Sequence, residues 1–255
     1  MKSTLNKAFF IVITLIFSGC NETQHNLERT LVSTPNSCYS GDKFIPNYNL
    51  SRFENDITNL EQIDIEEKNL FISNPIIFVG SSTIKIWNTF LKTDFPNLPV
   101  IGHGFGGSTF PELIYYRERL ITRYNPKSVV IYCENDLFTG QNKTEEQVLA
   151  DICYLVTDLH QLLPKTKFFL VSLKNSPARI QSISSFNRIN KAMEIFCQTR
   201  SYTKYIDITY AMYKADKLTL DESIFQSDGL HMNYNGYIRW KNIIKPILEA
   251  DYKSR

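Results

Sequence analysis

The stretch PIIFVGSS, residues 75–82, carries the strongest indication of the fold. Its four consecutive apolar residues, 76–79, are typical of a strand that is buried on both faces of a parallel sheet. The apolar run ends abruptly at Gly80, and Ser81 and Ser82 follow it. A buried parallel strand ends in this way where it reaches a site, so the two serines are either candidates for a nucleophile or caps of a following helix.

The rest of the chain alternates short apolar, β-branched segments with longer segments of helical period. The predicted strands cover residues 76–79, 99–101, 128–133, 167–173 and 205–208. The predicted helices cover residues 111–123, 144–163, 182–199 and 234–250. Alternation of this kind produces right-handed β-α-β units, so the sequence predicts an α/β fold in which a three-layer α/β/α sandwich is built around a five-stranded parallel sheet.

One further helix is predicted ahead of the first strand, behind a Ser51 cap. Its apolar residues recur at near-helical spacing and are expected to face the body of the domain: Phe53, Ile57, Leu60, Ile63 and Ile65. A folded domain is therefore expected over residues 51–255. Residues 21–50 are rich in Asn, Ser, Thr and Gln without a sustained apolar period, and they are expected to form a flexible tether or arm.

The composition is that of a single globular domain with balanced charge. The 255 residues are 43% hydrophobic and 21% charged, which is ordinary for a soluble domain. There are 28 Lys and Arg residues against 26 Asp and Glu residues, and removal of Lys2 and Lys7 with a signal segment makes the two counts equal. A neutral mature chain gives no reason to expect nucleic acid or another polyanion as a partner.

Residues 1–20 have the pattern of an export signal. Two lysines precede an apolar run over residues 8–17 that is too short to span a bilayer. The tripeptide Ser-Gly-Cys20 resembles the lipobox of bacterial lipoproteins, although Phe17 stands where that family usually has Leu. The resemblance implies a lipid-anchored protein in the periplasm or on the cell surface, with Cys20 as its N-terminus. The alternatives are a plain secretory signal with an incidental Cys20, or an uncleaved anchor.

Four further cysteines are scattered along the chain without a CxxC pair: Cys38, Cys133, Cys153 and Cys197. This spacing argues against a zinc site. They are expected to be buried thiols, although one pair could form a disulfide in an oxidising compartment.

Polar clusters follow the first three predicted strands. The first strand ends in Gly80-Ser-Ser, the second in Gly102-His-Gly-Phe-Gly-Gly107, and the third in Cys133-Glu-Asn-Asp136. In a parallel sheet, ligands bind beyond the carboxyl ends of the strands, where the loops converge. The three clusters are therefore expected on the same edge of the sheet, as parts of one site.

The second cluster satisfies the GxGxxG pattern of dinucleotide-binding folds through Gly102, Gly104 and Gly107. That pattern belongs to the first strand-to-helix turn and requires an acid roughly 20 residues further on. Residues 120–128 contain no acid, and the cluster follows the second strand rather than the first. A dinucleotide site is therefore not expected.

The segment SDGLHMN, residues 227–233, places a carboxylate and an imidazole three residues apart. Such a turn allows Asp228 to bind one ring nitrogen of His231, which leaves the other nitrogen to accept a proton. The alternatives are an ordinary turn residue and a structural histidine. Two of the four histidines lie in the predicted tether and in a polar-flanked helix. The other candidate base is His103, which lies inside the glycine cluster, where it could contact a substrate, but it has no acid near it in sequence.

Taken together, these motifs resemble the SGNH (GDSL-type) esterase and lipase family, whose four sequence blocks occur here in the same order. The matching residues are Gly80-Ser81-Ser82-Thr83-Ile84, Gly107, Glu134-Asn135-Asp136 and Asp228-Gly229-Leu230-His231. The likeness covers about residues 53–248 and is strongest to a bacterial subgroup with Gly-Ser-Ser in place of Gly-Asp-Ser. It implies the flavodoxin-like fold of SGNH hydrolases. The sequence departs from the subgroup at Gly102, where Asn is common, and at Cys133, where Gly is common.

The resemblance implies a role for each matching residue. Ser82 is implied as the nucleophile, with Asp228 and His231 completing a catalytic triad. The backbone N–H groups of Ser82 and Gly107 and the side chain of Asn135 are implied as the oxyanion hole. Glycine allows a backbone N–H to approach a developing negative charge closely, and the Asn amide is a neutral donor, so the residue types suit these roles. No metal or organic cofactor is implied.

The expected function is therefore that of a serine ester hydrolase that cleaves small acyl or acetyl esters through an acyl-enzyme on Ser82. The alternatives are a lysophospholipase or lipase-type acylhydrolase, and an inactive surface binding protein of the same fold. Short esters are favoured because helices and strands take up most of the chain between the blocks, which leaves little to build a lid. Phe105, Phe110 and Phe138 lie beside the blocks and are expected either in the core or in a modest acyl pocket. The expected partners are a small-molecule, glycan or lipid ester, and a membrane through the anchor on Cys20.

Overall fold

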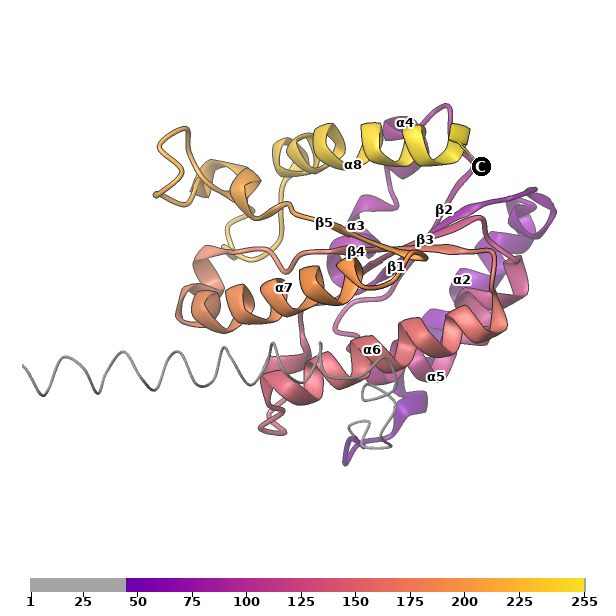
Figure 1. Cartoon of the computed structure of the whole chain (residues 1–255), viewed down its shortest axis with the longest axis horizontal. Helices are drawn as coiled ribbons and strands as arrows, with labels where there is room; N and C mark the ends of the chain where they lie inside the picture. Colours follow the sequence, from indigo (N-terminus) through magenta and orange to yellow (C-terminus); the bar gives the residue numbers. More distant parts are fainter. Residues whose placement is uncertain (1–44, 255) are drawn as a thin grey trace, which may run out of the picture.

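The computed structural model describes residues 45–254, and five strands among them form one parallel sheet. Its spatial order is β2-β1-β3-β4-β5 (Figure 1). The strands are β1 (Ile76–Gly80), β2 (Val100–Gly104), β3 (Ser128–Tyr132), β4 (Lys167–Val171) and β5 (Thr203–Ile206). The prediction of an α/β fold with a five-stranded parallel sheet is confirmed. The predicted signal segment with Cys20, and the predicted tether up to residue 44, lie outside the described residues.

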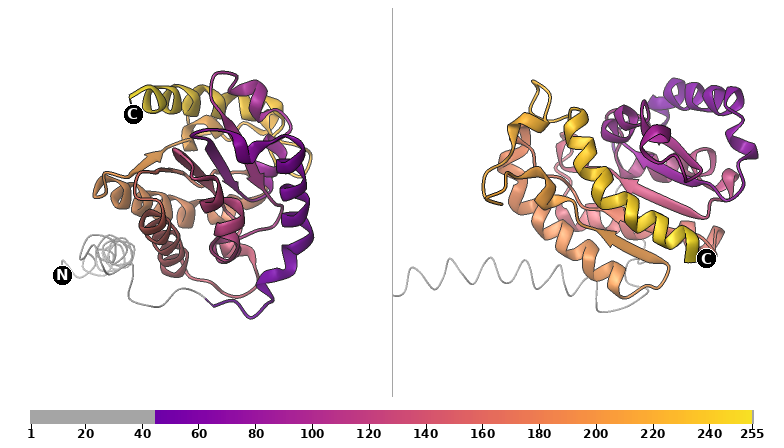
Figure 2. Two further views of the ribbon diagram at one scale, coloured as in Figure 1. Left: turned by 90° about the vertical axis from the view of Figure 1, so that its right-hand side faces the viewer. Right: turned by 90° about the horizontal axis from the view of Figure 1, so that it is seen from above.

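Helices cover both faces of the sheet, as Figures 1 and 2 show. One layer contains α2 (Glu54–Glu66), α5 (Phe110–Leu120), α6 (Glu145–Leu162) and α7 (Ile183–Gln198), and the opposite layer contains α3 (Ser82–Trp87), α4 (Leu91–Asp94) and α8 (Tyr234–Ser254). The connections include short 3₁₀ helices: η2 (Leu50–Phe53), η3 (Asn69–Phe71), η4 (Thr122–Tyr124), η5 (Asp136–Phe138), η6 (Pro177–Ser182), η7 (Thr209–Met212) and η8 (Glu222–Ile224). Within residues 45–254, none of the helices combines the length and the apolar character that crossing a membrane requires.

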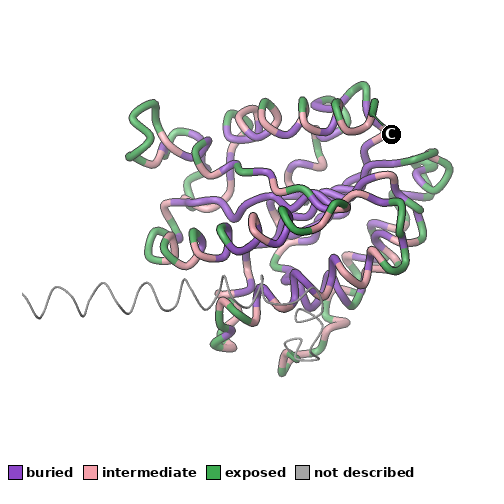
Figure 3. The backbone as a smooth tube through the Cα atoms, in the orientation of Figure 1, coloured by how far each residue is buried: buried purple, intermediate pink, exposed green. Residues whose placement is uncertain are grey.

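Each central strand contributes alternate side chains to two separate cores. In β1, Ile77 and Val79 pack in the core with α2, α5, α6 and α7, whereas Ile76 and Phe78 pack in the core with α3, α4 and α8. Every residue of β1 is therefore buried, and the centre of the sheet is coloured as buried throughout in Figure 3. This burial on both faces is the reason why β1 is a continuous apolar run instead of an alternating pattern.

The predicted helix before the first strand is present as α2, but its buried face differs from the prediction. Ile63 and Ile65 were expected to face the domain and are instead 40% and 63% exposed. The buried residue one turn after Leu60 is Asp64, which binds His103. A polar contact therefore occupies the place where the apolar spacing predicted isoleucine.

Two features of the fold have no counterpart in the sequence pattern. Periodicity does not predict α3 or α4, because their six and four residues are too few to show a helical repeat. The fifth strand begins at Thr203, earlier than predicted, because its backbone pairs with β4 from Phe168 onward.

Three cysteines lie within the described part of the chain, and all three are buried thiols: Cys133, Cys153 and Cys197. Burial raises the pKa of Cys133 and raises the pKa of Cys197 to about 12. Both groups therefore stay protonated at neutral pH, which suits packing in the core and not nucleophilic chemistry. Cys38 lies outside the described residues.

Candidate active site

The carboxyl ends of β1, β2 and β3 lie next to one another, because these strands are neighbours in the parallel sheet. Helix α3 begins at Ser82 directly after β1, the loop after β2 contains Gly107, and the loop after β3 contains Asn135. The loop before α8 reaches the same edge, where His231 contacts Ser82. The clusters that were expected at one edge of the sheet therefore lie in adjacent loops.

His231 links a hydroxyl group to a carboxylate. Its Nε2 atom lies 2.9 Å from Ser82 Oγ, and its Nδ1 atom lies 2.6 Å from Asp228 Oδ2. Ser82 and His231 are 149 residues apart in the sequence. The side chains of His231 and Asp228 are 25% and 45% exposed. This geometry allows the imidazole to take a proton from the serine hydroxyl while the carboxylate holds the ring in the required tautomer.

Asp228 is held by its own loop as well as by the imidazole. Its Oδ1 atom accepts hydrogen bonds from the backbone N–H groups of Leu230 and His231, both at 2.9 Å. Burial is the largest single influence and raises the pKa of Asp228, but the hydrogen bonds from the ring and the two backbone groups together outweigh it and lower the pKa to about 2. Asp228 is therefore a carboxylate at any pH near neutrality, and it stabilises the imidazolium form of His231.

Of the two serines after β1, only Ser82 faces the imidazole. Ser81 occupies the N-cap position of α3, but its side chain makes no capping hydrogen bond, and its buried Oγ has no partner among the described residues. The preceding Gly80 is required by a close approach, since a Cβ atom there would lie 1.7 Å from the backbone oxygen of Tyr132. The chain therefore turns tightly from β1 into α3 and presents Ser82 at the edge of the sheet.

Asn135 is held at both ends of its side-chain amide. Its Nδ2 donates to the backbone oxygen of Ser108 at 3.0 Å, and its Oδ1 accepts from Arg179 Nη2 at 2.7 Å. Arg179 was not among the residues predicted from the sequence to form the site. A signal was available, because Arg179 belongs to the polar segment after the fourth strand, at the same edge of the sheet as the other clusters.

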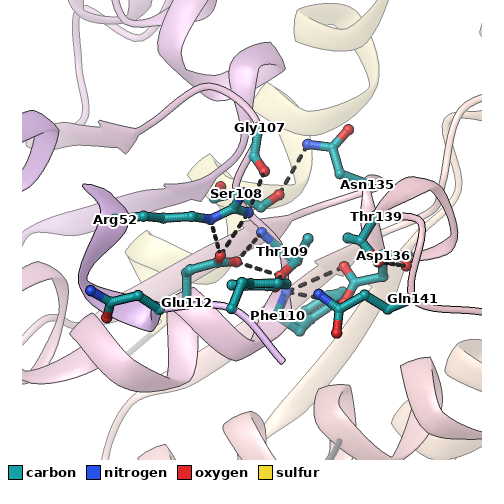
Figure 4. A network of polar contacts seen from close by, with 12 residues as sticks. Arg52, Gly107, Ser108, Thr109, Phe110, Glu112, Asn135, Asp136, Thr139 and Gln141 are labelled. Carbon is teal, nitrogen blue, oxygen red and sulfur yellow. Dashed lines mark hydrogen bonds and ion pairs between the residues drawn. The ribbon is translucent and has the colours of Figure 1, made fainter. Parts of the chain in front are cut away.

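The loop that contains Gly107 leads into α5 and is braced by a buried acid, as Figure 4 shows. Glu112 accepts from the backbone N–H of Thr109 at 2.9 Å and forms an ion pair with Arg52 at 2.7 Å. Arg52 also donates to the backbone oxygen of Gly107 at 3.5 Å. Gly107 has a φ of +82°, a left-handed conformation that glycine adopts without strain. The loop that carries the Gly107 N–H is thus fixed by contacts on both sides.

The described part of the segment predicted as a tether, residues 45–50, contacts this same loop region. The backbone N–H of Asn47 donates to Gln141 Oε1 at 2.9 Å, and the hydroxyl groups of Tyr48 and Thr109 lie 3.0 Å apart. The guanidinium of Arg52 stacks on the ring of Tyr48 at 4.3 Å. These residues therefore lie against the loops after β2 and β3.

His103 belongs to the core and not to the candidate site. It is 1% exposed, its Nδ1 lies 2.6 Å from the backbone oxygen of Leu120, and its Nε2 lies 3.0 Å from Asp64 Oδ2. Both ring nitrogens are engaged, so His103 can neither act as a base on a substrate nor contact one. An acid does orient it, but that acid comes from α2 and is 39 residues away in sequence.

The first two glycines of the pattern in the second cluster do not belong to a loop. Gly102 and Gly104 are residues of β2 itself, and a Cβ atom on Gly104 would lie 2.0 Å from the backbone nitrogen of Lys85 in α3. These glycines therefore permit close packing of a helix on the sheet. Among residues 45–254, no group of three or more His, Cys, Asp or Glu side chains is arranged to hold a metal ion.

Comparison with known proteins gives structural matches alone. No family model matches the chain, and no curated protein matches it in sequence. The fold is similar to that of a protein described as an acylhydrolase from Bacteroides fragilis, at 20% identity and a TM-score of 0.62 over 83% of this chain and 99% of that one. It is similar to a GDSL-like lipase from Bacteroides thetaiotaomicron, at 20% identity and a TM-score of 0.61 over 78% and 100% of the two chains. It is also similar to an acetyl xylan esterase from Geobacillus stearothermophilus, at 15% identity and a TM-score of 0.56 over 68% and 93%. The chain therefore shares its fold with proteins that are named as an acylhydrolase, a lipase and an esterase.

Proposed function

We propose that this protein is a serine ester hydrolase of the SGNH (GDSL-type) family. The observation that carries the proposal is the continuous set of hydrogen bonds from Ser82 through His231 to Asp228, at 2.9 and 2.6 Å. The order of the four sequence blocks and the fold shared with a GDSL-like lipase support the same class. An inactive binding protein would have no need of a hydroxyl, an imidazole and a carboxylate in this alignment.

In the first half of the reaction, Ser82 Oγ attacks the ester carbonyl carbon and its proton passes to His231 Nε2. The carbonyl oxygen becomes an oxyanion, and the ionised Asp228 stabilises the imidazolium. Collapse of the tetrahedral intermediate breaks the bond to the alcohol oxygen, which takes the proton from Nε2. The products of this half are the free alcohol and an acyl group on Ser82.

Three N–H donors are available for the oxyanion. Ser82 is the first residue of α3, so its backbone N–H has no carbonyl partner within the helix. Gly107 contributes a backbone N–H from the braced loop, and Asn135 contributes one hydrogen of its Nδ2. Donors that are held in place before the reaction stabilise the transition state without reorganising, which is usually the largest single contribution to this chemistry.

In the second half, His231 Nε2 takes a proton from water, and the resulting hydroxide attacks the acyl carbon. The same three donors bind the second oxyanion. Collapse releases the carboxylic acid and returns the proton to Ser82 Oγ. Each group ends in the state in which it began, and the reaction consumes one water for each ester.

We propose small acyl or acetyl esters as the substrates. Phe105 and Phe110 are 0% and 3% exposed and belong to the core, so they are not part of an acyl pocket. Phe138 remains at the surface, 42% exposed. Strands and helices account for most of the chain between the loops of the site, which leaves little to form an apolar trough or lid for a long acyl chain. The name of the similar acetyl xylan esterase is consistent with this class of substrate.

The proposal is tested by fluorophosphonate labelling with mapping of the modified residue, together with hydrolysis of p-nitrophenyl esters. Fluorophosphonate should modify Ser82, and Ser82→Ala should abolish both labelling and turnover. Ser81→Ala is the matched control, because the Ser81 hydroxyl is buried without a partner and its loss removes no hydrogen bond. That variant should keep both labelling and activity.

The ester series should extend from acetyl to palmitoyl, with acetylated sugars and lysophospholipid beside it. We expect kcat/KM to be highest for short acyl groups. Labelling at Ser81, or activity in Ser82→Ala, would contradict the assignment of the nucleophile. A steady rise of kcat/KM with chain length, or cleavage of lysophospholipid while acetyl esters are inert, would contradict the substrate class alone.

A further inference from the structure

A side-chain amide can stabilise an oxyanion only if its nitrogen, and not its oxygen, faces the reacting atoms. The two ends of an Asn amide have nearly the same shape, so packing alone does not select the orientation. A flipped amide would present a lone pair to the developing negative charge and oppose the reaction. The contacts of Asn135 therefore decide whether it can act as a donor.

Arg179 and the backbone oxygen of Ser108 select the orientation together, because the first can only donate and the second can only accept. The guanidinium of Arg179 has five N–H donors and no acceptor, and its Nη2 lies 2.7 Å from Asn135 Oδ1. Only the oxygen end of the amide can occupy that position. The nitrogen end then donates one hydrogen to the backbone oxygen of Ser108, and its second hydrogen has no acceptor among the described residues.

Arg179 is itself held firmly in place. It is 9% exposed, its Nη1 donates to the backbone oxygen of Glu134 at 2.9 Å, and its guanidinium stacks on the ring of Phe138 at 4.0 Å. The carboxylate of Glu134 lies 3.5 Å from Nη1 and also binds the buried Lys174. The guanidinium of Arg179 thus donates hydrogen bonds both to the backbone of the loop after β3 and to the Asn135 side chain of that loop.

The charge of the Glu134 carboxylate, which contacts Arg179, depends on the groups around it. Burial by itself favours the neutral acid, but the nearby cations Lys174 and Arg179 lower the pKa of Glu134 below its ordinary value. An ionised Glu134 lies beside Nη1 of the guanidinium, whereas Asn135 is bound by Nη2.

We propose that Arg179 is a positioning residue of the oxyanion hole, which fixes the amide of Asn135 with its free N–H toward the site and keeps a permanent positive charge one hydrogen bond behind it. The proposal rests on the proposed function, because it presumes that Asn135 binds the oxyanion. A hydrogen bond to a charged donor is stronger than one to a neutral donor and polarises the amide, which makes its N–H a better donor. The benefit grows as negative charge develops, so it acts on the transition state more than on the bound ester.

The test is a double-mutant cycle on kcat and KM for p-nitrophenyl acetate. Asn135→Ala should lower kcat by about 10²–10³ with little change in KM. Arg179→Met, which keeps the length of the side chain and removes its donors, should lower kcat by about 10–10² with KM unchanged, through partial loss of the same interaction. In the Asn135→Ala background, Arg179→Met should have almost no further effect, because the group through which it acts is absent.

Arg179→Lys and Arg117→Met are the companion variants. An ammonium at position 179 keeps the charge but cannot bind both oxygens in the fork geometry of the guanidinium, so its kcat should lie between those of the wild type and Arg179→Met. Arg117 also binds a carboxylate and a backbone carbonyl, those of Asp158 and Ile114, but it joins α5 to α6 away from the loops. Its replacement should leave kcat unchanged.

Three outcomes would overturn the assignment of Arg179: a loss of kcat in Arg179→Met that is equally large with and without Asn135, a change confined to KM, or full activity. If Arg179→Met does not fold, the same cycle with Arg179→Lys gives the answer. Failure of the proposed function would give a different result: the wild type would not hydrolyse esters, or Ser82→Ala would remain active.

Discussion

Asp228 differs from an ordinary surface aspartate in the number of hydrogen bonds that it accepts. One oxygen receives two backbone N–H groups and the other receives the His231 ring. The pKa of about 2 that results means that Asp228 does not titrate in the range where an ester hydrolase is assayed. In the proposed reaction Asp228 is therefore expected to act as a carboxylate throughout that range.

Asp228→Asn tests this conclusion at the scale of one atom. The amide would keep the shape of the loop but would place an NH₂ group against His231 Nδ1 and favour the wrong tautomer, so kcat should fall by about 10⁴. The two enzymes should be compared at the pH at which each has its highest kcat, since Asp228 is ionised at any pH near neutrality. A variant with a maximal kcat close to that of the wild type would contradict the role of the Asp228 carboxylate in orienting His231.

At the scale of the elements, helix α2 is attached to the sheet by a polar contact at the position where isoleucine was predicted. Asp64 of α2 binds the ring of His103 in β2, the hydroxyl group of Tyr124 and the amide of Asn69. The ring of His103 thus joins the backbone oxygen of Leu120, on its Nδ1 side, to the carboxylate of Asp64, on its Nε2 side. Burial raises the pKa of Asp64, but the hydrogen bonds from His103, Tyr124 and Asn69 outweigh it, and the net pKa lies below the ordinary value of 3.8.

Asp64→Asn should lower the free energy of unfolding by about 1.5–3 kcal/mol near pH 6, because it removes the buried carboxylate that His103, Tyr124 and Asn69 contact. Since the folded-state pKa of Asp64 lies below the unfolded value, the contribution is complete above about pH 5 and is lost as the pH falls through the folded-state pKa. Urea unfolding at pH 6 and pH 3 measures the change.

The control for this variant is Asp56→Asn on the same helix, which breaks an exposed pair with Lys85 and should cost less than about 1 kcal/mol. If the wild type and Asp64→Asn differed as much at pH 3 as at pH 6, the ionised carboxylate of Asp64 would not be the source of the stability.

At the scale of the whole molecule, the site lies at one edge of the sheet. The first described residues of the chain lie against the loops at that edge. Residues 47 and 48 contact the loops after β2 and β3. We propose that the protein is exported and that Cys20 is the lipidated N-terminus, with the segment up to residue 44 between the anchor and the domain. The apolar run over residues 8–17 and the tripeptide Ser-Gly-Cys20 motivate this proposal.

Cys20→Ser should release the protein from the membrane fraction or block its processing, because the acyl chains on the cysteine supply the apolar area that holds a lipoprotein in the bilayer. The measurement is fractionation with labelling by a radioactive fatty acid, and Cys38→Ser serves as the control. The proposal would be wrong if Cys20→Ser and the wild type were equally associated with the membrane and the wild type carried no lipid label. Residues 1–20 would then be a plain signal or an uncleaved anchor.

The alternation of strands and helices was predictable because a strand that is buried on both faces, such as β1, consists of an uninterrupted run of apolar residues. The pairing of Asp228 with His231 was open to prediction for a similar reason, since both partners lie within one turn of the chain. The buried face of α2 could not be predicted, because the pattern of apolar residues contains no information about the buried contact between Asp64 and His103. The short helix α3 was missed although it presents Ser82, because six residues show no period.

The sequence by itself determined what depends on neighbours along the chain: the α/β class, the end of the first strand at Gly80, and the local turn that joins Asp228 to His231. Only the tertiary structure decided which distant residues meet. Ser82 meets His231 across 149 residues, and Asn135 meets Arg179 across 44. The physical reason is that these contacts depend on the order of the strands in the sheet and on the side chains that fill the space between loops, which no local pattern records.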